Sequence, residues 1–175
     1  VLPQVRIADP ADPEIDLLLV SPTNGAVVVE VKGGVISLRD GDWYSYDHRL
    51  KRSPVTQALQ GKHALVRRLR KQSVDLNDIY IEHAIALPDV TSIPRDGLGV
   101  EVAADSVFTK ADLENPENRL HRLTKVHEPV PSERLAALLQ AIRPTVELSV
   151  GDAGLMEVAA RRLDAGTRQL LASAR

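Results

Sequence analysis

The chain contains no cysteine, and it has only one methionine, one tryptophan and one phenylalanine among its 175 residues. Without cysteine it forms no disulfide and carries out no thiol chemistry, and this composition fits a reducing compartment, so we expect a cytoplasmic protein. No apolar run approaches the roughly 20 residues that a membrane-spanning helix needs, so we expect no membrane partner. The first residues lack both a secretory-signal pattern and an initiator methionine, which indicates a fragment of a longer protein.

Several common catalytic signatures are also missing. The five histidines show no zinc-ligand spacing, no serine lies in a nucleophile-elbow context, and there is no Walker-type glycine loop. We therefore expect each histidine to be structural or on the surface. The hydrophobic content of 43% and the charged content of 26% are those of an ordinary globular chain.

Acidic residues are absent from one long interval of this nearly neutral chain. The net charge of −2 argues against a generic nucleic-acid binder. Between His48 and Val74, however, eight basic residues occur without any Asp or Glu. A local positive field suits a groove that binds a polyanion, although a solvated helix face explains the same pattern. The candidate nucleic-acid-binding residues are Arg49, Lys51, Arg52, Lys62, Arg67 and Arg68.

The order of the predicted elements indicates an α/β fold with a mixed sheet, because strands come first, then a long helix, then a further strand. Ser53 as N-cap and Pro54 at the first helical position predict that this helix runs to about Gln72. Its predicted apolar stripe consists of Val55, Leu59, Val66 and Leu69. Further helices are predicted over 132–142 and 152–175. Strands are predicted over 4–9, 14–21, 26–33, 35–39, 42–46, 79–87 and 106–109.

Two charged residues interrupt the most valine-rich strand, VVVEVKGG at 27–34. Glu and Lys are almost never fully buried unless they are paired. Because side chains alternate along a strand, Glu30 and Lys32 lie on the same face. If the chain turns back at 22–25, Asp16 reaches the same end of the hairpin. The sequence therefore predicts a cluster of two carboxylates and one ammonium, although an ion pair on an amphipathic hairpin explains the same residues.

This cluster depends on the register of the hairpin. For Asp16 to share a face with Glu30, the numbers of paired residues must sum to an even value such as 46 or 48. That sum requires a loop with an odd number of residues, or a bulge at Gly25. Two carboxylates so placed suit Mg²⁺ or Mn²⁺. A neighbouring lysine can orient or deprotonate water and stabilise charge that develops on phosphorus.

Several motifs together resemble one nuclease family. Asp16, Glu30 and Lys32 form a D-x13-E-x-K pattern. The chain also contains E-I-D, E-V-K-G-G and a P-x-x-Q-A helix start that includes Gln57. Over roughly residues 3–125 the chain resembles the NERD, or nuclease-related, domain of the PD-(D/E)XK superfamily. The resemblance implies a restriction-endonuclease-like mixed β-sheet flanked by helices. It implies a nuclease-related domain over 1–128 and a helical C-terminal extension or linker over 129–175.

The resemblance also assigns roles to residues of this chain. Asp16, Glu30 and the backbone carbonyl of Val31 would ligate Mg²⁺ or Mn²⁺, and Lys32 would be the catalytic lysine. The remaining implied site residues are an accessory acid, Glu14, and a supporting polar group from the helix, Gln57. This chain departs from the family in having Ile15 where the superfamily has proline, and it starts too late to include the family's N-terminal helix with its own glutamate. If that helix supplies a ligand, we expect the fragment to be inactive.

Three functions stay open at this point. The first is a metal-dependent nuclease acting on DNA. The second is a catalytically silent nucleic-acid-binding module that positions a fused helicase or kinase, and the third is a protein-interaction domain. The segment 161–175 is similar to the region preceding the ATP-binding core of superfamily-one helicases, and it also fits an amphipathic linker helix. Aromatic side chains after the predicted turn either stack on bases or cap the sheet: Trp43, Tyr44 and Tyr46.

Overall fold

The computed structural model describes residues 1–5, 14–77, 79–94, 98, 102–124 and 128–143. The chain divides into two units, Val1–Arg143 and Pro144–Arg175. The predicted helix over 152–175 and most of the predicted strand over 4–9 lie outside the described residues. The domain boundary at 128 stays a prediction.

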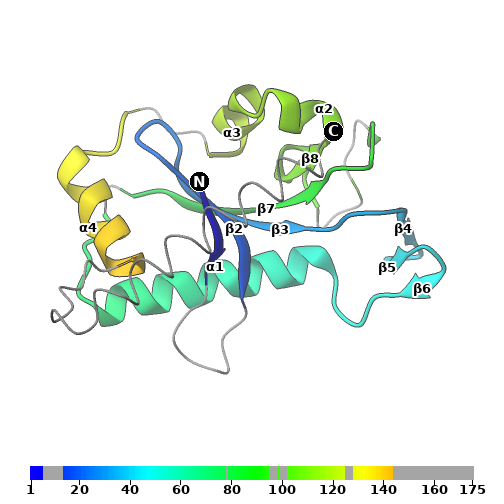
Figure 1. Ribbon diagram of the computed structural model, residues 1–175, viewed down its shortest axis with the longest axis horizontal. Helices are drawn as coiled ribbons and strands as arrows, with labels where there is room; N and C mark the ends of the chain where they lie inside the picture. The colour runs from blue at the N-terminus through cyan, green and yellow to red at the C-terminus, as the bar shows by residue number, and fades with distance from the viewer. Residues whose placement is uncertain (6–13, 78, 95–97, 99–101, 125–127, 144–175) are drawn as a thin grey trace, which may run out of the picture. The chain divides into compact units, whose positions relative to one another are not determined.

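A five-stranded mixed sheet forms the centre of the first unit (Figure 1). Its strands β1, β2 and β3 pair antiparallel, whereas β3 pairs parallel with β7 and β7 pairs parallel with β8. The sheet therefore has the predicted mixed α/β character. In spatial order its strands are β1 (Leu2–Val5), β2 (Ile15–Ser21), β3 (Gly25–Val31), β7 (Ile81–Leu87) and β8 (Val107–Thr109).

The β2–β3 hairpin has the register that the sequence analysis required. Residues 22–24 form an odd, three-residue loop, and the numbers of every residue pair from Leu17↔Val29 to Ser21↔Gly25 sum to 46. Gly25 is needed at the turn because its φ is 66° and a Cβ there would collide with the Tyr80 carbonyl oxygen. Extending this register by one pair brings Asp16 opposite Glu30.

Helix α1 (Pro54–Lys71) packs along one face of the sheet. The Ser53 hydroxyl caps it by accepting the Thr56 N–H at 3.0 Å, as predicted. The predicted apolar stripe is confirmed in part: Leu69 is buried, and Val55 is half-buried and packs against a core cluster. Val66 is also half-buried, so the stripe is wrong only at the exposed Leu59. The buried side of the helix is made mainly of small residues and leucines: Ala58, Gly61, Ala64, Leu65 and Leu69.

Close approach explains this choice of helix face. A Cβ on Gly61 would lie 3.1 Å from Val28 Cγ1 and 3.2 Å from Ile15 Cγ1. The small residues Gly61 and Ala64 therefore let the helix backbone approach the sheet. The larger Leu59 is left 36% exposed.

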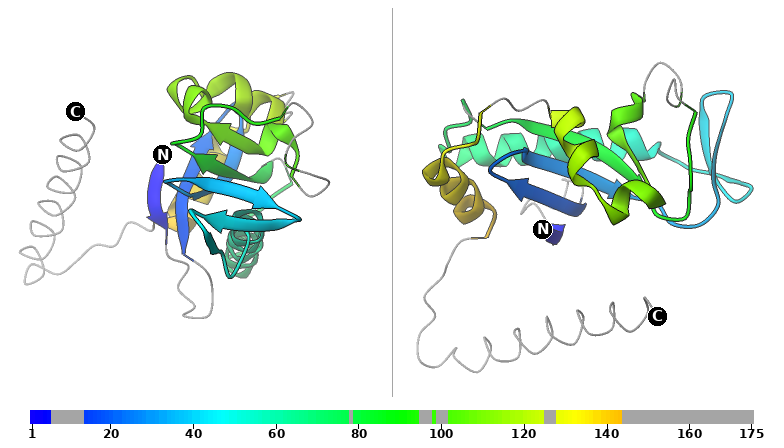
Figure 2. Two further views of the ribbon diagram at one scale, coloured as in Figure 1. Left: turned by 90° about the vertical axis from the view of Figure 1, so that its right-hand side faces the viewer. Right: turned by 90° about the horizontal axis from the view of Figure 1, so that it is seen from above.

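Helices also cover the other face and one end of the sheet. On the face opposite α1, Leu120 packs with valines and alanines of β3 and β7 and with Phe108. Leu138 and Ile142, by contrast, join the core between the sheet and α1. Figure 2 shows this layering from two further directions. Leu120 lies on α3 (Glu117–Thr124), and Leu138 and Ile142 lie on α4 (Ser132–Ile142). The two short helices that precede α3 are η1 (Ala104–Ser106) and α2 (Lys110–Glu114).

A small second sheet connects β3 to α1. It consists of β4 (Ile36–Arg39), β5 (Asp42–Ser45) and β6 (His48–Arg49), all antiparallel. The predicted turn at Asp40-Gly41 is present, and Trp43 is only 6% exposed because it packs into a core cluster with Ala58. This burial fixes the small sheet beside the start of α1. None of the helices in the described part of the chain is long and apolar enough to cross a bilayer.

Candidate active site

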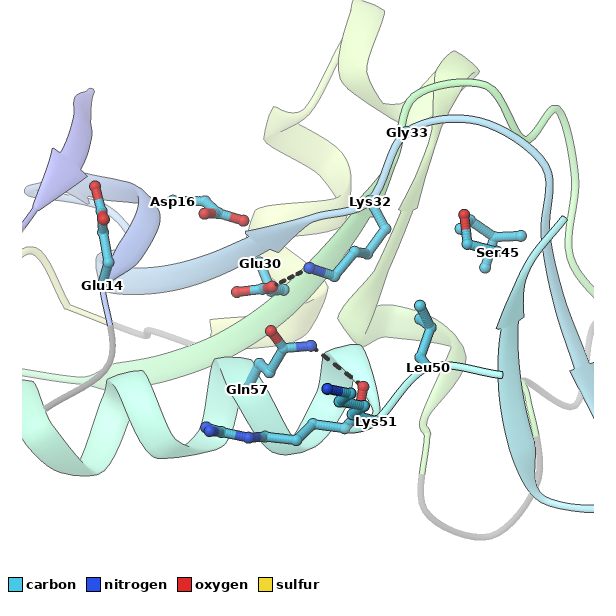
Figure 3. Close-up of a pocket in the computed structure, with 11 residues that line it drawn as sticks. Glu14, Asp16, Glu30, Lys32, Gly33, Ser45, Leu50, Lys51 and Gln57 are labelled. Carbon is cyan, nitrogen blue, oxygen red and sulfur yellow. Dashed lines mark hydrogen bonds and ion pairs between the residues drawn. The ribbon is translucent and has the colours of Figure 1, made fainter. Parts of the chain in front are cut away.

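An open cleft of about 590 Å³ lies where β3 ends, between the start of α1 and the small sheet (Figure 3). Six groups were predicted from the sequence to take part in catalysis or metal binding, and five of them line this cleft. The sixth, the backbone carbonyl of Val31, is not among the lining groups. The lining residues are Glu14, Asp16, Glu30, Lys32, Gly33, Ile36, Ser45, Leu50, Lys51, Arg52 and Gln57.

Asp16 and Glu30 come from neighbouring strands of the hairpin. Asp16 Oδ2 accepts the Val31 backbone N–H at 2.8 Å, so the carboxylate takes the place of a strand partner at the end of the β2–β3 ladder. Glu30 is only 6% exposed. Because the N–H and the carbonyl of a residue in a strand point to the same side, the Val31 carbonyl also lies toward β2 and Asp16.

Lys32 follows directly after β3, and its backbone N–H donates to the Ala86 carbonyl at 2.9 Å. Its ammonium Nζ lies 2.5 Å from Glu30 Oε1, the ion pair drawn in Figure 3. The side chain of Lys32 keeps 27% of its surface exposed, so the ammonium is reachable from the cleft. The structure thus joins Glu30 and Lys32 directly.

The surroundings of Glu30 favour its neutral form. Burial is the largest influence and raises the pKa of this carboxyl above its ordinary value of 4.5. The hydrogen bond from Lys32 acts in the opposite direction, and the nearby negative charge of Asp16 raises the pKa further. Two neighbouring carboxylates, of which only Glu30 pairs with the Lys32 ammonium, form a site that a divalent cation would stabilise.

Gln57 extends from the first turn of α1 toward the two acids. Its Nε2 donates to the backbone carbonyls of Arg52 at 3.3 Å and Ser53 at 3.5 Å, while Figure 3 shows its oxygen turned toward Glu30. Glu14 also lines the cleft, but it is exposed and lies on the far side of Asp16 from Lys32 in Figure 3. Within the described ranges, no three His, Cys, Asp or Glu residues form a group that could hold a metal ion.

Only two of the six candidate nucleic-acid-binding residues line this cleft, Lys51 and Arg52. Arg49 pairs with Asp42 at 2.6 Å and lines a neighbouring pocket of about 390 Å³. Lys62 pairs with Glu82 on β7 at 2.7 Å. The other two residues, Arg67 and Arg68, lie further along α1 and are not among the lining residues.

The residues that shape the far wall of the cleft were not predicted from the sequence. Ile36, Ser45 and Leu50 belong to the small sheet and the segment after it. Asp89 was also not predicted. Its Oδ2 accepts the Gly34 N–H at 2.6 Å and so holds the loop after Lys32. An acid directly after Pro88 at the end of a parallel strand was the signal that could have drawn attention to it.

Comparison with known proteins supports the family resemblance. The comparison with curated proteins and the comparison with solved structures each gave no match. The sequence model named NERD, the nuclease-related domain, matches residues 1–88. That match spans just over half of the chain and includes β2, β3, the small sheet and α1. The chain belongs to the nuclease-related domain family.

Proposed function

We propose that this domain is a metal-dependent nuclease that hydrolyses phosphodiester bonds of DNA. The observation that carries the proposal is the convergence of Asp16, Glu30 and Lys32 on one open cleft whose rim also carries Lys51 and Arg52. Membership of the nuclease-related domain family supports the same reaction class.

The donor set fits a hard divalent cation. Mg²⁺ usually takes one or two carboxylates from a protein and keeps several waters, so a third acidic ligand is not required. Asp16, Glu30 and the Val31 carbonyl would hold Mg²⁺ or Mn²⁺, with Glu14 as an accessory acid. When bound, such an ion supplies Lewis-acid polarisation of the scissile phosphate.

The other residues of the cleft have separate tasks in this proposal. Lys32 places its ammonium where negative charge develops on the phosphoryl oxygens, and it orients the attacking water. Hydrolysis joins the water oxygen to phosphorus, breaks one P–O ester bond and transfers a proton to the departing oxygen. Gln57 supports Glu30 from the helix. Lys51 and Arg52, which line the same cleft, bind phosphates of the substrate backbone.

Cleavage of plasmid and single-stranded DNA with Mn²⁺ tests this proposal. We expect Asp16→Ala, Glu30→Ala and Lys32→Ala each to lose most of the activity of the unmodified chain. Glu133→Gln, which changes an exposed acid on α4, is the matched control and should cut normally. Equal activity in all of these proteins would remove the hypothesis.

A silent nucleic-acid-binding module is the second candidate function. The 2.5 Å ion pair favours it, because the Lys32 ammonium engages a Glu30 oxygen that a metal ion would need. Such a module would position a fused helicase or kinase in the cytoplasm, in line with the helicase-like segment 161–175. Salt-dependent DNA binding without Mn²⁺-dependent cleavage would favour this function over the nuclease.

A further inference from the structure

The turn between β5 and β6 carries an aromatic residue where turn chemistry favours a small one. Ser45 pairs with His48, so Tyr46 and Asp47 form a two-residue loop. Tyr46 has a φ of 55°, in the left-handed region that such loops normally fill with Gly, Asn or Asp. The neighbouring hairpin follows that rule with Asp40 and Gly41.

Burial of the ring does not compensate for this unfavourable backbone. Tyr46 is 61% exposed, whereas Trp43 on the adjacent strand is 6% exposed and belongs to the core. The Tyr44 ring lies under the Arg39 guanidinium, with 5.0 Å from Arg39 Cζ to the ring centroid. A strained residue whose side chain stays in solvent is a candidate for a functional role.

The Tyr46 ring packs against Gly34, the residue that follows the cleft-lining Gly33. The Tyr46 backbone N–H donates to the Val35 carbonyl at 2.7 Å. A Cβ on Gly34 would lie 3.2 Å from Tyr46 Cε2 and 3.3 Å from its Oη, so the tip of the ring rests on the glycine backbone. The residues next to these two in sequence, Gly33 and Ser45, both line the cleft.

We propose that Tyr46 is a stacking platform for an unpaired nucleobase of the strand whose backbone enters the cleft. This inference rests on the proposed function and specifies its substrate as single-stranded or frayed DNA. Every base offers a π-face, so an exposed aromatic ring beside cationic side chains binds single strands without reading their sequence. A base inside a duplex is already stacked and would have to be extruded before it could reach Tyr46.

The test compares Tyr46→Gly and Tyr46→Phe with the unmodified protein. Glycine removes the ring and also suits the positive φ, so this variant keeps the turn intact. Binding of a labelled oligothymidylate and of a matched duplex is followed by fluorescence anisotropy in EDTA, so that no strand is cut. Tyr80→Ala is the control, because Tyr80 is 42% exposed and lies at the opposite end of β3, against Gly25.

We expect Tyr46→Gly to weaken single-strand binding by roughly 5- to 150-fold, with Tyr46→Phe and Tyr80→Ala unchanged. An equal loss for Gly and Phe would overturn the inference, because the hydroxyl rather than the ring face would then be responsible. Unchanged binding by Tyr46→Gly would also overturn it, while leaving a cleaving protein as a nuclease. If the unmodified protein neither bound nor cut DNA, the proposed function itself would fail.

Discussion

Glu30 and Glu82 are glutamates on adjacent strands, yet their surroundings shift their pKa values in opposite directions. Burial dominates at Glu30 and raises its pKa above 4.5. Burial acts in the same direction at Glu82, but hydrogen bonds from His83 and Lys62 outweigh it and lower the pKa to about 2. The first carboxylate is therefore held at a cost in stability, and the second contributes to stability.

Glu30→Gln should make the protein more stable at pH 7. A folded-state pKa above the ordinary value means that the contribution of Glu30 is fully present below pH 4.5 and is lost as pH rises through the folded-state pKa. The substitution keeps the shape and removes the buried charge, so we expect the free energy of unfolding to rise by about 0.5–2 kcal/mol, the range of common stabilising changes. Urea unfolding measures this free energy. A Glu30→Gln protein less stable than the unmodified chain would contradict the claim that the buried Glu30 charge is destabilising.

Glu82→Gln should have the opposite effect. Glu82 Oε1 lies 2.7 Å from Lys62 Nζ and 2.6 Å from His83 Nδ1. Because its folded-state pKa is lowered, its contribution is present above pH 4.5 and is lost as pH falls toward about 2. We expect a loss of about 1.5–3 kcal/mol in the free energy of unfolding at pH 7, the range for hydrogen bonds to charged groups. If the urea midpoints of Glu82→Gln equalled those of the unmodified chain from pH 7 to pH 2, Glu82 would not contribute to stability.

At the residue scale, the sequence predicts the acids of the site better than the partners of its basic residues. Alternation along two strands and an odd loop were enough to bring Asp16 and Glu30 together. The basic interval contains no acid of its own, but Arg49 pairs with Asp42 of β5. Likewise, Lys62 of α1 pairs with Glu82 of β7. Such pairs depend on tertiary packing, which cannot be predicted from a local sequence pattern.

At the scale of elements, the contact between α1 and the sheet decides where Gln57 lies. The valine-rich β3 and the Ser53-Pro54 start of α1 are strong local signals, and both elements were predicted. The buried side of α1 was predicted only in part, because the apolar stripe drawn from helical periodicity included Leu59, which is exposed. Short α2 and α3 were also missed, since α2 buries no residue and α3 buries only Leu120 and Thr124.

Gly61→Ala tests this contact. Alanine gains roughly 1 kcal/mol of helix propensity over glycine, whereas overpacking a tight core costs about 1–3 kcal/mol. Since the new Cβ would lie 3.1 Å from Val28 and 3.2 Å from Ile15, we expect a net loss on the order of 1 kcal/mol in thermal unfolding. Gln60→Ala, at an exposed position of the same helix, is the control. A stabilised Gly61→Ala protein would show that α1 is less tightly packed than described.

At the scale of the whole described unit, the cleft exists because the small sheet is fixed by Trp43 beside the end of β3. This arrangement brings Lys51 and Arg52 to the cleft of the two acids, although they lie about 20 residues from Glu30 and about 35 residues from Asp16 in sequence. The position of Lys51 and Arg52 near the acids could not be predicted from the sequence. The sequence indicated a basic interval but not which of its residues face the acids.

Replacing Lys51 and Arg52 together by Gln should weaken DNA binding and reduce its salt dependence. Each lost phosphate contact lowers the slope of log K against log salt by about 0.7–0.9, with the smaller value for single strands. Lys71→Gln, an exposed residue in the last turn of α1, is the matched control. Equal slopes for all three proteins, measured by anisotropy at several salt concentrations, would remove these two residues from the DNA-binding surface.

Mn²⁺ titration followed by calorimetry shows whether Asp16 and Glu30 form a metal site, independently of any cleavage. We expect the unmodified chain to bind Mn²⁺, and we expect Asp16→Asn and Glu30→Gln each to weaken this binding by at least about tenfold. Glu133→Gln should bind like the unmodified chain. Undetectable binding by the unmodified chain, or equal binding by Asp16→Asn, would contradict the account.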